Sequence, residues 1–320
     1  MFETKITKML SIKYPIIGGT MMSLAKPDFV AAISNAGGLG ILASAMYQSG
    51  EEFAHAIDQL QAATDKPYAV NINLVPMKKP VDNNVFIDIM TEKGVEIVET
   101  SGHSAPKEML ERFKEAGMTW MHKCVGVKYA LTVQKLGADI VTVVGYENGG
   151  ATGRFDTGTL VLIPSVRDAI DLPLIGGGGV SDGRGLVAVL ALGADAAIIG
   201  TRLLLTRECP MHDNVKQSLL NSTELDTMLL MRSIGATHRV WSNQAAQECL
   251  ELEKSGADLD EVISAVAGDK ARRMFETGDI TCGTLSCGQG IGLVHDIPTV
   301  KELFDNIMAQ AKEIAGQLSN

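Results

Sequence analysis

Two glycine-rich corners constrain the fold of this chain more than any other feature. Four consecutive glycines, Gly176–Gly179, end the apolar run Leu172–Ile175. A second apolar run, Ala196–Ile199, ends in Gly200-Thr201. Glycine lets the backbone close on an anion because no side chain holds the anion away from the N–H groups, and a following helix adds its positive N-terminal dipole. In a β/α barrel the loops after the last two strands commonly hold phosphate, so the corners predict a cradle for a phosphorylated ligand.

The segment between the two corners sets their orientation. Asp182 can cap a helix over 183–192, and Gly193 then turns the chain into the next strand, so both corners face the same end of a sheet. Glycine-rich turns also occur in α/β proteins simply because the chain reverses there. The spacing of the pair favours a phosphate site over a plain turn.

Short apolar runs alternate with amphipathic ones from residue 14 to about 203. Continuous Val, Ile and Ala runs are typical of parallel strands that are buried on both faces. Eight such units predict a (β/α)8 TIM barrel, an α/β fold. An open doubly wound sheet is the alternative, but the glycines after the first run lack the third glycine of its fingerprint. The predicted strands are Tyr14–Ile17, Leu39–Ala43, Tyr68–Leu74, Val95–Thr100, Thr119–Lys123, Ile140–Val144, Leu172–Ile175 and Ala196–Ile199.

After Thr206 the pattern becomes more polar and mostly helical. We therefore expect a discontinuous barrel, formed by residues 1–206 and 276–320, with a small helical insertion over 207–275 on the substrate side. A long amphipathic helix from Val300 is expected to pack back on the barrel. The helices predicted in the insertion are Cys209–Asn221, Glu224–Ile234, Gln244–Lys254 and Leu259–Val266.

Charge and cysteine content exclude several classes of protein. The formal net charge is -10 and no basic run is longer than Lys78-Lys79, whereas nucleic-acid phosphates are held by clustered Lys and Arg. No apolar stretch is long enough to cross a bilayer, and the first residues lack a secretory signal, so we expect a cytoplasmic protein without a membrane partner. The five cysteines are scattered without C-x-x-C spacing, which predicts reduced, buried thiols and no metal site.

A set of short segments, spread over nearly the whole chain, carries a family resemblance. The segments are Tyr14–Ile17 followed by Met21, Ser34–Gly40, Val70-Asn71, Gly137–Asp139, Gly145–Gly150, Gly176–Gly185, Gly193–Thr201, Gly278-Asp279 and Gly288-Gln289. Their combined spacing resembles the nitronate monooxygenase family, formerly called 2-nitropropane dioxygenases. Its near relatives are the FMN-dependent NADH:quinone reductases and the flavin enoyl-thioester reductases. Three further segments resemble the quinone-reductase branch: Glu99–Gly102, His122–Cys124 and Thr206–His212.

The resemblance implies FMN at the C-terminal mouth of the barrel. Its phosphate would lie on the two glycine corners, and its ring on the backbone after the first strand. Lys123 would stabilise the negative charge that reduced flavin carries near N1, although a lysine that ends a strand can also simply reach solvent. The residues implied for cofactor binding are Gly19, Thr20, Met21, Met22, Asn73, Lys123, Gly150, Gly177, Gly178, Gly179, Gly200, Thr201 and Gln289.

One position departs from the family pattern. In most of the family a histidine follows the two glycines of the sixth-strand loop, and this chain has Ala151 there. The change removes the obvious general base beside the flavin and leaves a larger, less polar pocket. Glu147 can equally act as a local cap, His122 can pack under Lys123, and His103 can lie in solvent. The catalytic candidates are Lys123, Tyr146, Glu147 and the Ala151 position, with His103 and His122 in addition.

Oxidation of an alkyl nitronate by O2 through flavin N5 is the activity that the resemblance implies. The alternative is NAD(P)H-dependent reduction of a quinone, or reduction or dehydrogenation of an acyl-CoA-type thioester, which Ala151 and the quinone-reductase-like segments favour. FMN is the expected cofactor, with NAD(P)H as a reductant. A homodimer is also expected, and the loop Pro76–Pro80 is a candidate lid.

Two functions of other classes stay open at this point. A phosphate-binding barrel without flavin, of the nucleotide-dehydrogenase type, would use the same glycine corners but needs a nucleophilic cysteine on a mobile loop. A flavin-binding protein that has lost catalysis would also be consistent with Ala151.

Overall fold

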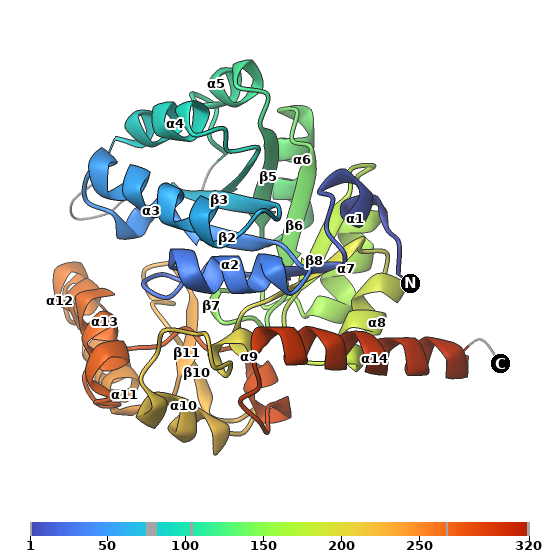
Figure 1. Ribbon diagram of the computed structural model, residues 1–320. Helices are drawn as coiled ribbons and strands as arrows, with labels where there is room; N and C mark the ends of the chain where they lie inside the picture. Colours follow the sequence, from blue (N-terminus) through green and yellow to red (C-terminus); the bar gives the residue numbers. More distant parts are fainter. Residues whose placement is uncertain (1, 75–81, 103–104, 267, 319–320) are drawn as a thin grey trace.

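Eight parallel strands form a closed barrel in the computed structural model, which describes residues 2–74, 82–102, 105–266 and 268–318. The hydrogen-bonded order is β1-β9-β8-β6-β5-β4-β3-β2. The two ends of this order meet where Gly18 N donates to Leu39 O at 2.9 Å and Leu39 N donates to Ile16 O at 3.0 Å. The predicted TIM barrel is therefore confirmed (Figure 1). The strands are β1 Ile16–Gly18, β2 Gly40–Ala43, β3 Tyr68–Asn73, β4 Ile97–Ser101, β5 Thr119–Cys124, β6 Ile140–Val144, β8 Leu174–Gly177 and β9 Ala196–Ile199.

The barrel interior is apolar at one end and polar at the other. Helix α1 (Lys5–Met9) supplies Ile6 to a cluster that contains one or two inward side chains from each barrel strand. Toward the C-terminal ends of the strands the inward positions change to polar residues, such as Asn71 and Glu99, which pair across β3 and β4. The apolar half is a packed core, and the polar half lies where this fold places its site.

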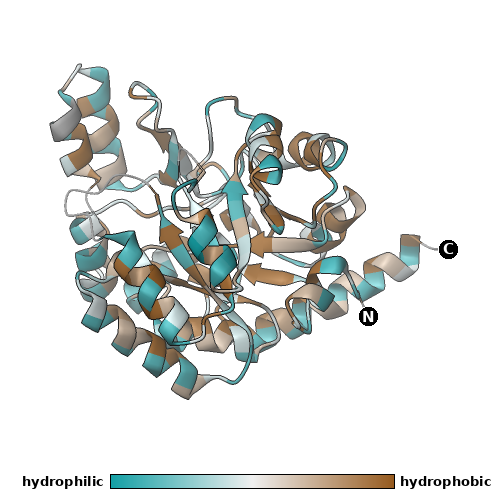
Figure 2. Ribbon diagram, turned by 90° about the horizontal axis from the view of Figure 1, so that it is seen from above, coloured by the Kyte–Doolittle hydropathy of each residue, from teal (hydrophilic) through white to brown (hydrophobic). Residues whose placement is uncertain are grey.

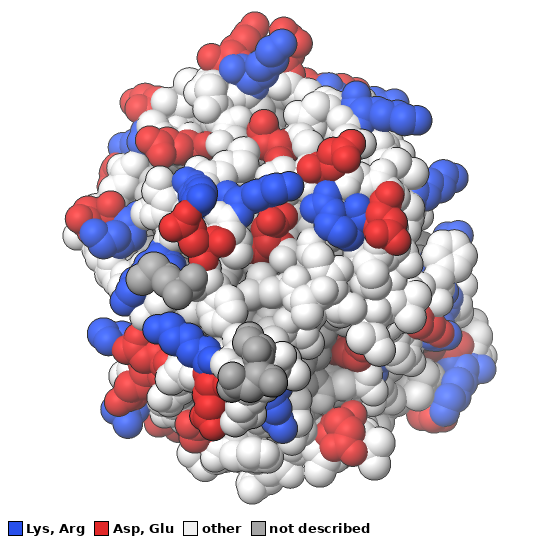
Figure 3. Space-filling model, turned by 90° about the vertical axis from the view of Figure 1, so that its right-hand side faces the viewer, with Lys and Arg blue, Asp and Glu red and all other residues white. Residues whose placement is uncertain are grey.

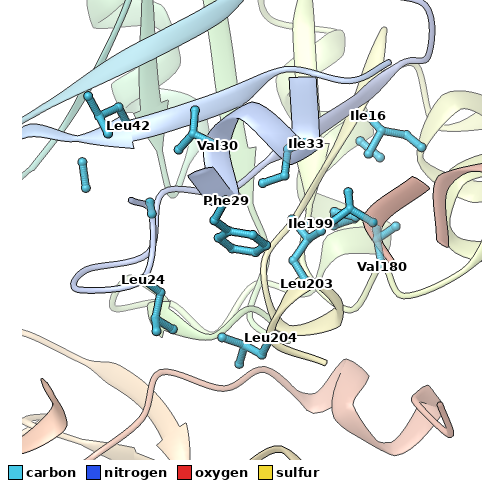
Figure 4. Packing of buried hydrophobic residues seen from close by; sticks show 14 of the residues in the cluster. Ile16, Leu24, Phe29, Val30, Ile33, Leu42, Val180, Ile199, Leu203 and Leu204 are labelled. Carbon is cyan, nitrogen blue, oxygen red and sulfur yellow. The ribbon is translucent and has the colours of Figure 1, made fainter. Parts of the chain in front are cut away.

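The outer layer of helices buries its apolar faces on the strands (Figure 2). In α2 (Pro27–Asn35), Pro27 opens the helix and Phe29, Val30 and Ile33 are buried. Phe29 points toward Ile199 and the residues that follow it (Figure 4). The other helices of this layer are α3 Gly50–Ala63, α4 Asn83–Glu92, α5 Leu110–Glu115, α6 Val127–Lys135, α7 Thr159–Arg167, α8 Gly183–Ala191 and α9 Thr201–Leu204, with the short η1 Ser44–Met46 after β2.

The insertion contains a β-hairpin in addition to helices. Strand β10 (Thr227–Leu230) pairs with β11 (His238–Trp241), and β11 pairs with β7 (Gly150–Ala151), which belongs to the loop after β6. The helix predicted over Glu224–Ile234 is therefore wrong. Met and Leu suit helix and strand alike, and the cross-strand pairing decides between them. The helices of this segment are α10 Asp213–Leu220, α11 Gln244–Lys254, α12 Leu259–Ala265 and α13 Gly268–Thr277.

A separate small core holds the insertion together. Leu230 and Val240 of the hairpin pack with Ala246 and Cys249 of α11 and Val262 of α12. In contrast, Val215 of α10 belongs to the main core of the barrel. The predicted domain boundaries at 207 and 275 stay a prediction.

The C-terminal segment returns to the barrel as expected. After η2 (Gln289–Leu293), helix α14 (Val300–Leu318) runs along α8 and contacts α2 (Figure 1). On the face that carries both termini, basic and acidic side chains are interspersed (Figure 3). Within the described part of the chain, no helix combines the length and the apolar character that a membrane span requires.

Candidate active site

A buried carboxylate lies at the polar end of the barrel interior. Glu99 of β4 is fully buried. Its Oε2 accepts a hydrogen bond from Asn71 Nδ2 at 2.6 Å and another from Thr20 Oγ1 at 2.7 Å. Thr20 follows β1 and belongs to the segment predicted to support the flavin ring. The carboxylate therefore ties this segment to the floor of the barrel.

Lys123 lies between that carboxylate and the mouth. Its Nζ is 3.6 Å from Glu99 Oε1, an atom without a hydrogen-bond partner among the described residues. The lysine side chain is 23% exposed, whereas Glu99 is fully buried. The buried carboxylate and the partly exposed ammonium group attract each other, which holds the lysine side chain at this end of the barrel. The arrangement fits a ring that becomes negatively charged above Lys123.

The first glycine corner has the predicted backbone freedom. Gly178 and Gly179 have φ of 109° and 74°, values that side chains other than glycine rarely adopt. A Cβ on Gly178 would lie 2.4 Å from Thr159 Oγ1. A Cβ on Gly200 of the second corner would meet no atom within 4 Å, so this corner borders open space. Both corners fit a phosphate group that approaches the backbone closely.

The first N–H groups of α8 already have partners within the protein. Asp182 caps this helix as expected, and its carboxylate accepts from Arg184 N at 2.9 Å and from Gly185 N at 3.3 Å. Gly183 N donates to Gln310 Oε1 of α14 at 2.7 Å. An anion at this corner would therefore be held by the glycine loops and Thr201 rather than by these N–H groups. Thr201 Oγ1 accepts from Gly288 N at 2.8 Å, next to Gln289.

Two catalytic candidates in the loop after β6, Glu147 and Tyr146, already contact other protein groups. Glu147 accepts from Thr159 N at 2.9 Å and from Thr159 Oγ1 at 2.8 Å, so it caps the first turn of α7. The ring of Tyr146 lies 4.4 Å from the guanidinium of Arg239. For Glu147 the structure shows the local cap that the sequence left as an alternative. A catalytic role for either residue stays a prediction.

Arg239 is a site residue that the sequence analysis missed. It is 3% exposed, and its Nε donates to Tyr146 O at 3.1 Å. Its Nη2 has no hydrogen-bond partner among the described residues, and none of their carboxylates forms an ion pair with it. A buried cation without a carboxylate is costly, which is typical of a functional site. The only sequence signal was a charged residue inside the apolar hairpin.

A histidine from the insertion lies opposite Ala151. His238 of β11 pairs with Ala151 of β7, and its Nε2 is 2.9 Å from Ser286 Oγ. Burial lowers the pKa of His238 to about 4, so the imidazole is neutral at pH 7. Ala151 is exposed. The sequence could not reveal this neighbour because only the pairing of β7 with β11 brings the two positions together.

The remaining predicted residues divide into three groups. Gly19, Met21, Asn73 and Gln289 are half-buried at the same end of the barrel, Gly150 and Gly177 are buried, and Met22 is exposed. His122 points out of the barrel, with Nδ1 2.7 Å from Thr100 Oγ1, and is therefore not brought to the mouth. His103 and the loop Pro76–Pro80 lie outside the described residues.

The described cysteines and acidic residues do not form a nucleophilic or metal site. Burial raises the pKa of Cys124, Cys209 and Cys287 to about 12, so these thiols are protonated at pH 7. Cys282 is half-buried and its pKa is also raised, by burial and by Asp279. No three His, Cys, Asp or Glu side chains gather as metal ligands in the described ranges.

A recess adjoins the hairpin beside Ala151. It has a volume of about 470 Å³ and is lined by Arg154, Arg232, Ser233, Ile234, Gly235 and Thr237. Arg154 follows β7 and Thr237 precedes β11, and Thr152 N donates to Thr237 O at 3.3 Å. Arg232 pairs with Asp156 at 2.5 Å, whereas no ion pair of the described residues includes Arg154. Such a recess suits an anionic group.

Comparisons with known proteins agree with this geometry. The model of the nitronate monooxygenase family matches residues 3–310. The chain is 34% identical to a (3aS,4S,5R,7aS)-5-hydroxy-7a-methyl-1-oxo-octahydro-1H-indene-4-carboxyl-CoA dehydrogenase of Rhodococcus jostii, over 97% of this chain and 96% of that protein. It is 30% identical to a probable nitronate monooxygenase of Staphylococcus saprophyticus, over 98% of each chain.

Among solved structures, FabK from Thermotoga maritima is similar, with a TM-score of 0.90, 30% identity and coverage of 99% of this chain and 98% of that one. The family can be assigned from the match over almost the full length of the chain, and the buried polar residues and glycine corners at the mouth agree with it. This chain belongs to the nitronate monooxygenase family and is a flavin-dependent oxidoreductase.

Proposed function

We propose that this flavin-dependent oxidoreductase binds FMN and acts on an acyl thioester of the coenzyme A type. This is the alternative function of the sequence analysis. The observation that carries it is the recess beside Ala151, which is lined by Arg154 and Arg232. Phosphate groups of a coenzyme A moiety are the anions that two arginines bind well.

The charge of the recess supports this substrate. The chain as a whole carries a net charge of -10, so two guanidinium groups in one recess contrast with the overall sign. Arg232 is held by Asp156, which fixes its direction. Arg154 lies against Gly235, where a Cβ would come within 2.9 Å of its Nη2. Arg154 is thus the arginine whose charge is available to a ligand.

FMN is the form of flavin that fits the mouth. The glycines at Gly178, Gly179 and Gly200 would hold its single phosphate, and Lys123 would lie at the ring. Bound there, the flavin supplies redox chemistry at N5. The chain supplies the floor of the site through Glu99, Asn71 and Thr20, which fix the segment after β1.

Oxidation of an alkyl nitronate by O2 is the second candidate. It is supported by the family and by the Staphylococcus relative, whose name is probable nitronate monooxygenase. A nitronate has already lost the proton from its carbon, so its oxidation does not require a general base at the Ala151 position. The acyl thioester is favoured because a small nitronate would leave the arginine recess unused.

The experiment is anaerobic stopped-flow spectroscopy of the purified holoenzyme. Flavin absorption is followed after mixing with NADH, NADPH, butyryl-CoA or ethylnitronate, and the reduced enzyme is then mixed with crotonyl-CoA or a quinone. Flavin that is reduced by a saturated acyl-CoA, or reoxidised by crotonyl-CoA, supports the proposal. Reduction by ethylnitronate alone overturns it in favour of the second candidate, and reoxidation by a quinone alone overturns it in favour of a quinone reductase.

A variant pair tests the recess itself. Arg154→Ala is expected to raise KM for the acyl-CoA at least tenfold, because a charge-assisted contact to phosphate is lost. Lys135→Ala, at the C-terminal end of α6 and the opposite end of the barrel, is the control. Use of the pantetheine thioester, which lacks the nucleotide phosphates, should abolish the difference between wild type and Arg154→Ala.

A further inference from the structure

The titratable groups that the structure places at the mouth are almost all engaged with other protein groups. Glu147 caps α7 through Thr159, and Glu99 is bound by Asn71 and Thr20. The Lys123 ammonium faces Glu99. None of these groups is placed to exchange a proton with a substrate carbon.

His238 differs from these groups. Its Nε2 is 2.9 Å from Ser286 Oγ, and its Nδ1 has no hydrogen-bond partner among the residues that the structure describes. Some side-chain atoms of the described residues are buried and lack a hydrogen-bond partner, such as Glu99 Oε1 and Arg239 Nη2. Nδ1 of His238 is not one of these buried atoms. One ring nitrogen is therefore fixed by the protein, and the other is open.

Two contacts hold the imidazole at the β6 loop. A Cβ on Gly150 would lie 3.7 Å from Cε1 of His238, so the ring packs on the backbone of β7. Ser286 forms a bridge with Val240 of β11, which fixes the hydroxyl beside the ring. Ala151 is the cross-strand partner of His238 and carries only a methyl group, so the partner side chain leaves space beside the imidazole.

We propose that His238 is the proton-exchanging residue of the site, with its Nδ1 as the reacting atom and Ser286 as the positioning residue that orients the ring. The inference rests on the proposed function in one respect: the substrate must have a C–H bond, next to an electron-withdrawing group, that breaks or forms during the reaction. When Nε2–H donates to Ser286 Oγ, Nδ1 presents a lone pair. The C–H bond breaks, its electron pair stays on carbon, and an N–H bond forms at Nδ1.

The chemistry of the neighbours supports this assignment. The His238 ring is neutral at pH 7, so Nδ1 carries a lone pair when Nε2 carries the proton; the burial that lowers the pKa of His238 also weakens it as a base, so the assignment rests on the placement of Nδ1. After uptake of the proton both ring nitrogens carry hydrogen, and Nε2–H still donates to the Ser286 hydroxyl, so the same contact holds the ring in both directions of the proton transfer. The reverse step delivers the proton from Nδ1–H to carbon.

The test is deuterium exchange into two probes, butyryl-CoA and nitroethane, by the oxidised holoenzyme in D2O without an electron acceptor. Mass spectrometry follows exchange at the carbon next to the thioester or nitro group, relative to buffer alone. His238→Gln keeps a polar side chain of similar size but cannot take up a proton near neutral pH. It is expected to reduce enzyme-dependent exchange at least 100-fold.

Variants of Ser286 distinguish a positioning role from a role in proton transfer. Ser286→Ala is expected to reduce exchange about tenfold, and Ser286→Thr, which keeps the hydroxyl, should restore it. His55→Gln, an exposed histidine on α3, is the control. Flavin content and circular dichroism of every variant are compared with wild type, and ¹⁵N spectra of the histidine rings, recorded without cofactor, should show a shift of the His238 signal in Ser286→Ala.

The outcomes are distinct. Exchange at the wild-type rate in His238→Gln overturns the proposal, and so does a wild-type enzyme that exchanges neither probe. Exchange of nitroethane alone, lost in His238→Gln, supports the role of His238 while it contradicts the acyl-thioester function.

Discussion

The ammonium group of Lys123 lies 3.6 Å from the carboxylate of Glu99, a residue that is fully buried beneath it. The pair joins β4 to β5 at the polar end of the barrel, and Thr20 extends it to the segment after β1. A cation that faces the mouth and an anion behind it act on a bound ring with opposite sign.

This relationship predicts opposite shifts of the flavin midpoint potential. Lys123→Met removes the cation near the ring, so the potential should fall by about 30 mV or more, which corresponds to about 1.4 kcal/mol for a two-electron couple. Glu99→Gln removes the anion and should raise the potential. Spectroelectrochemical titration measures both values, with Lys135→Met as the control; shifts of the same sign would contradict the assignment.

Gly178 is expected to be intolerant of any side chain. Gly178→Ala places a Cβ 2.4 Å from Thr159 Oγ1 at a φ of 109°, so it should lower both the melting temperature and the flavin content of the purified protein. Gly137→Ala is the matched control, since φ is 89° but the Cβ would meet nothing within 4 Å. The control should lose only about 1–2 kcal/mol of stability through strain and keep its flavin. Equal flavin content in both variants would exclude the cradle.

Phe29 anchors α2 to the barrel. Phe29→Ala should reduce the free energy of unfolding by about 3–5 kcal/mol, because the fully buried ring leaves a cavity. Phe155→Ala removes a ring that is 75% exposed and should change stability by less than about 0.5 kcal/mol. Urea denaturation followed by tryptophan fluorescence compares the two variants, and a loss in Phe29→Ala as small as that in Phe155→Ala would contradict the packing.

Acid should destabilise the protein through His122. Burial lowers the pKa of this histidine to about 4 in the folded state, from an ordinary value of 6.5. Above pH 6.5 the ring is neutral in the folded and the unfolded state, so it does not lower the free energy of unfolding. As the pH falls from 6.5 to 4 the unfolded state binds the proton first, so about 3 kcal/mol of stability is lost. Unfolding free energies of His122→Gln should fall less over this range than those of His55→Gln, and parallel curves would rule out the assignment.

The barrel could be predicted from the sequence because buried parallel strands are continuous apolar runs between helical windows. All eight predicted runs overlap a strand of the barrel, and no end differs from that of the strand by more than two residues. The hairpin β10–β11 could not be predicted, since Met and Leu at 228–230 suit either structure and only pairing with His238 and Arg239 decides it.

The site was predictable only where one chain segment builds it. The glycine corners and the Asp182 cap are local features of the sequence. Glu99, Arg239 and His238 depend on neighbours from distant strands, so their burial and pairing become visible only in three dimensions.

Strand β7 connects the barrel to the small antiparallel sheet, because it lies in the loop after β6 and forms the edge of that sheet. The hairpin and the rim of the barrel are therefore held together through β7. An exchange of the 207–275 segment between relatives would carry over its specificity only if the two residues of β7 were transplanted together with it.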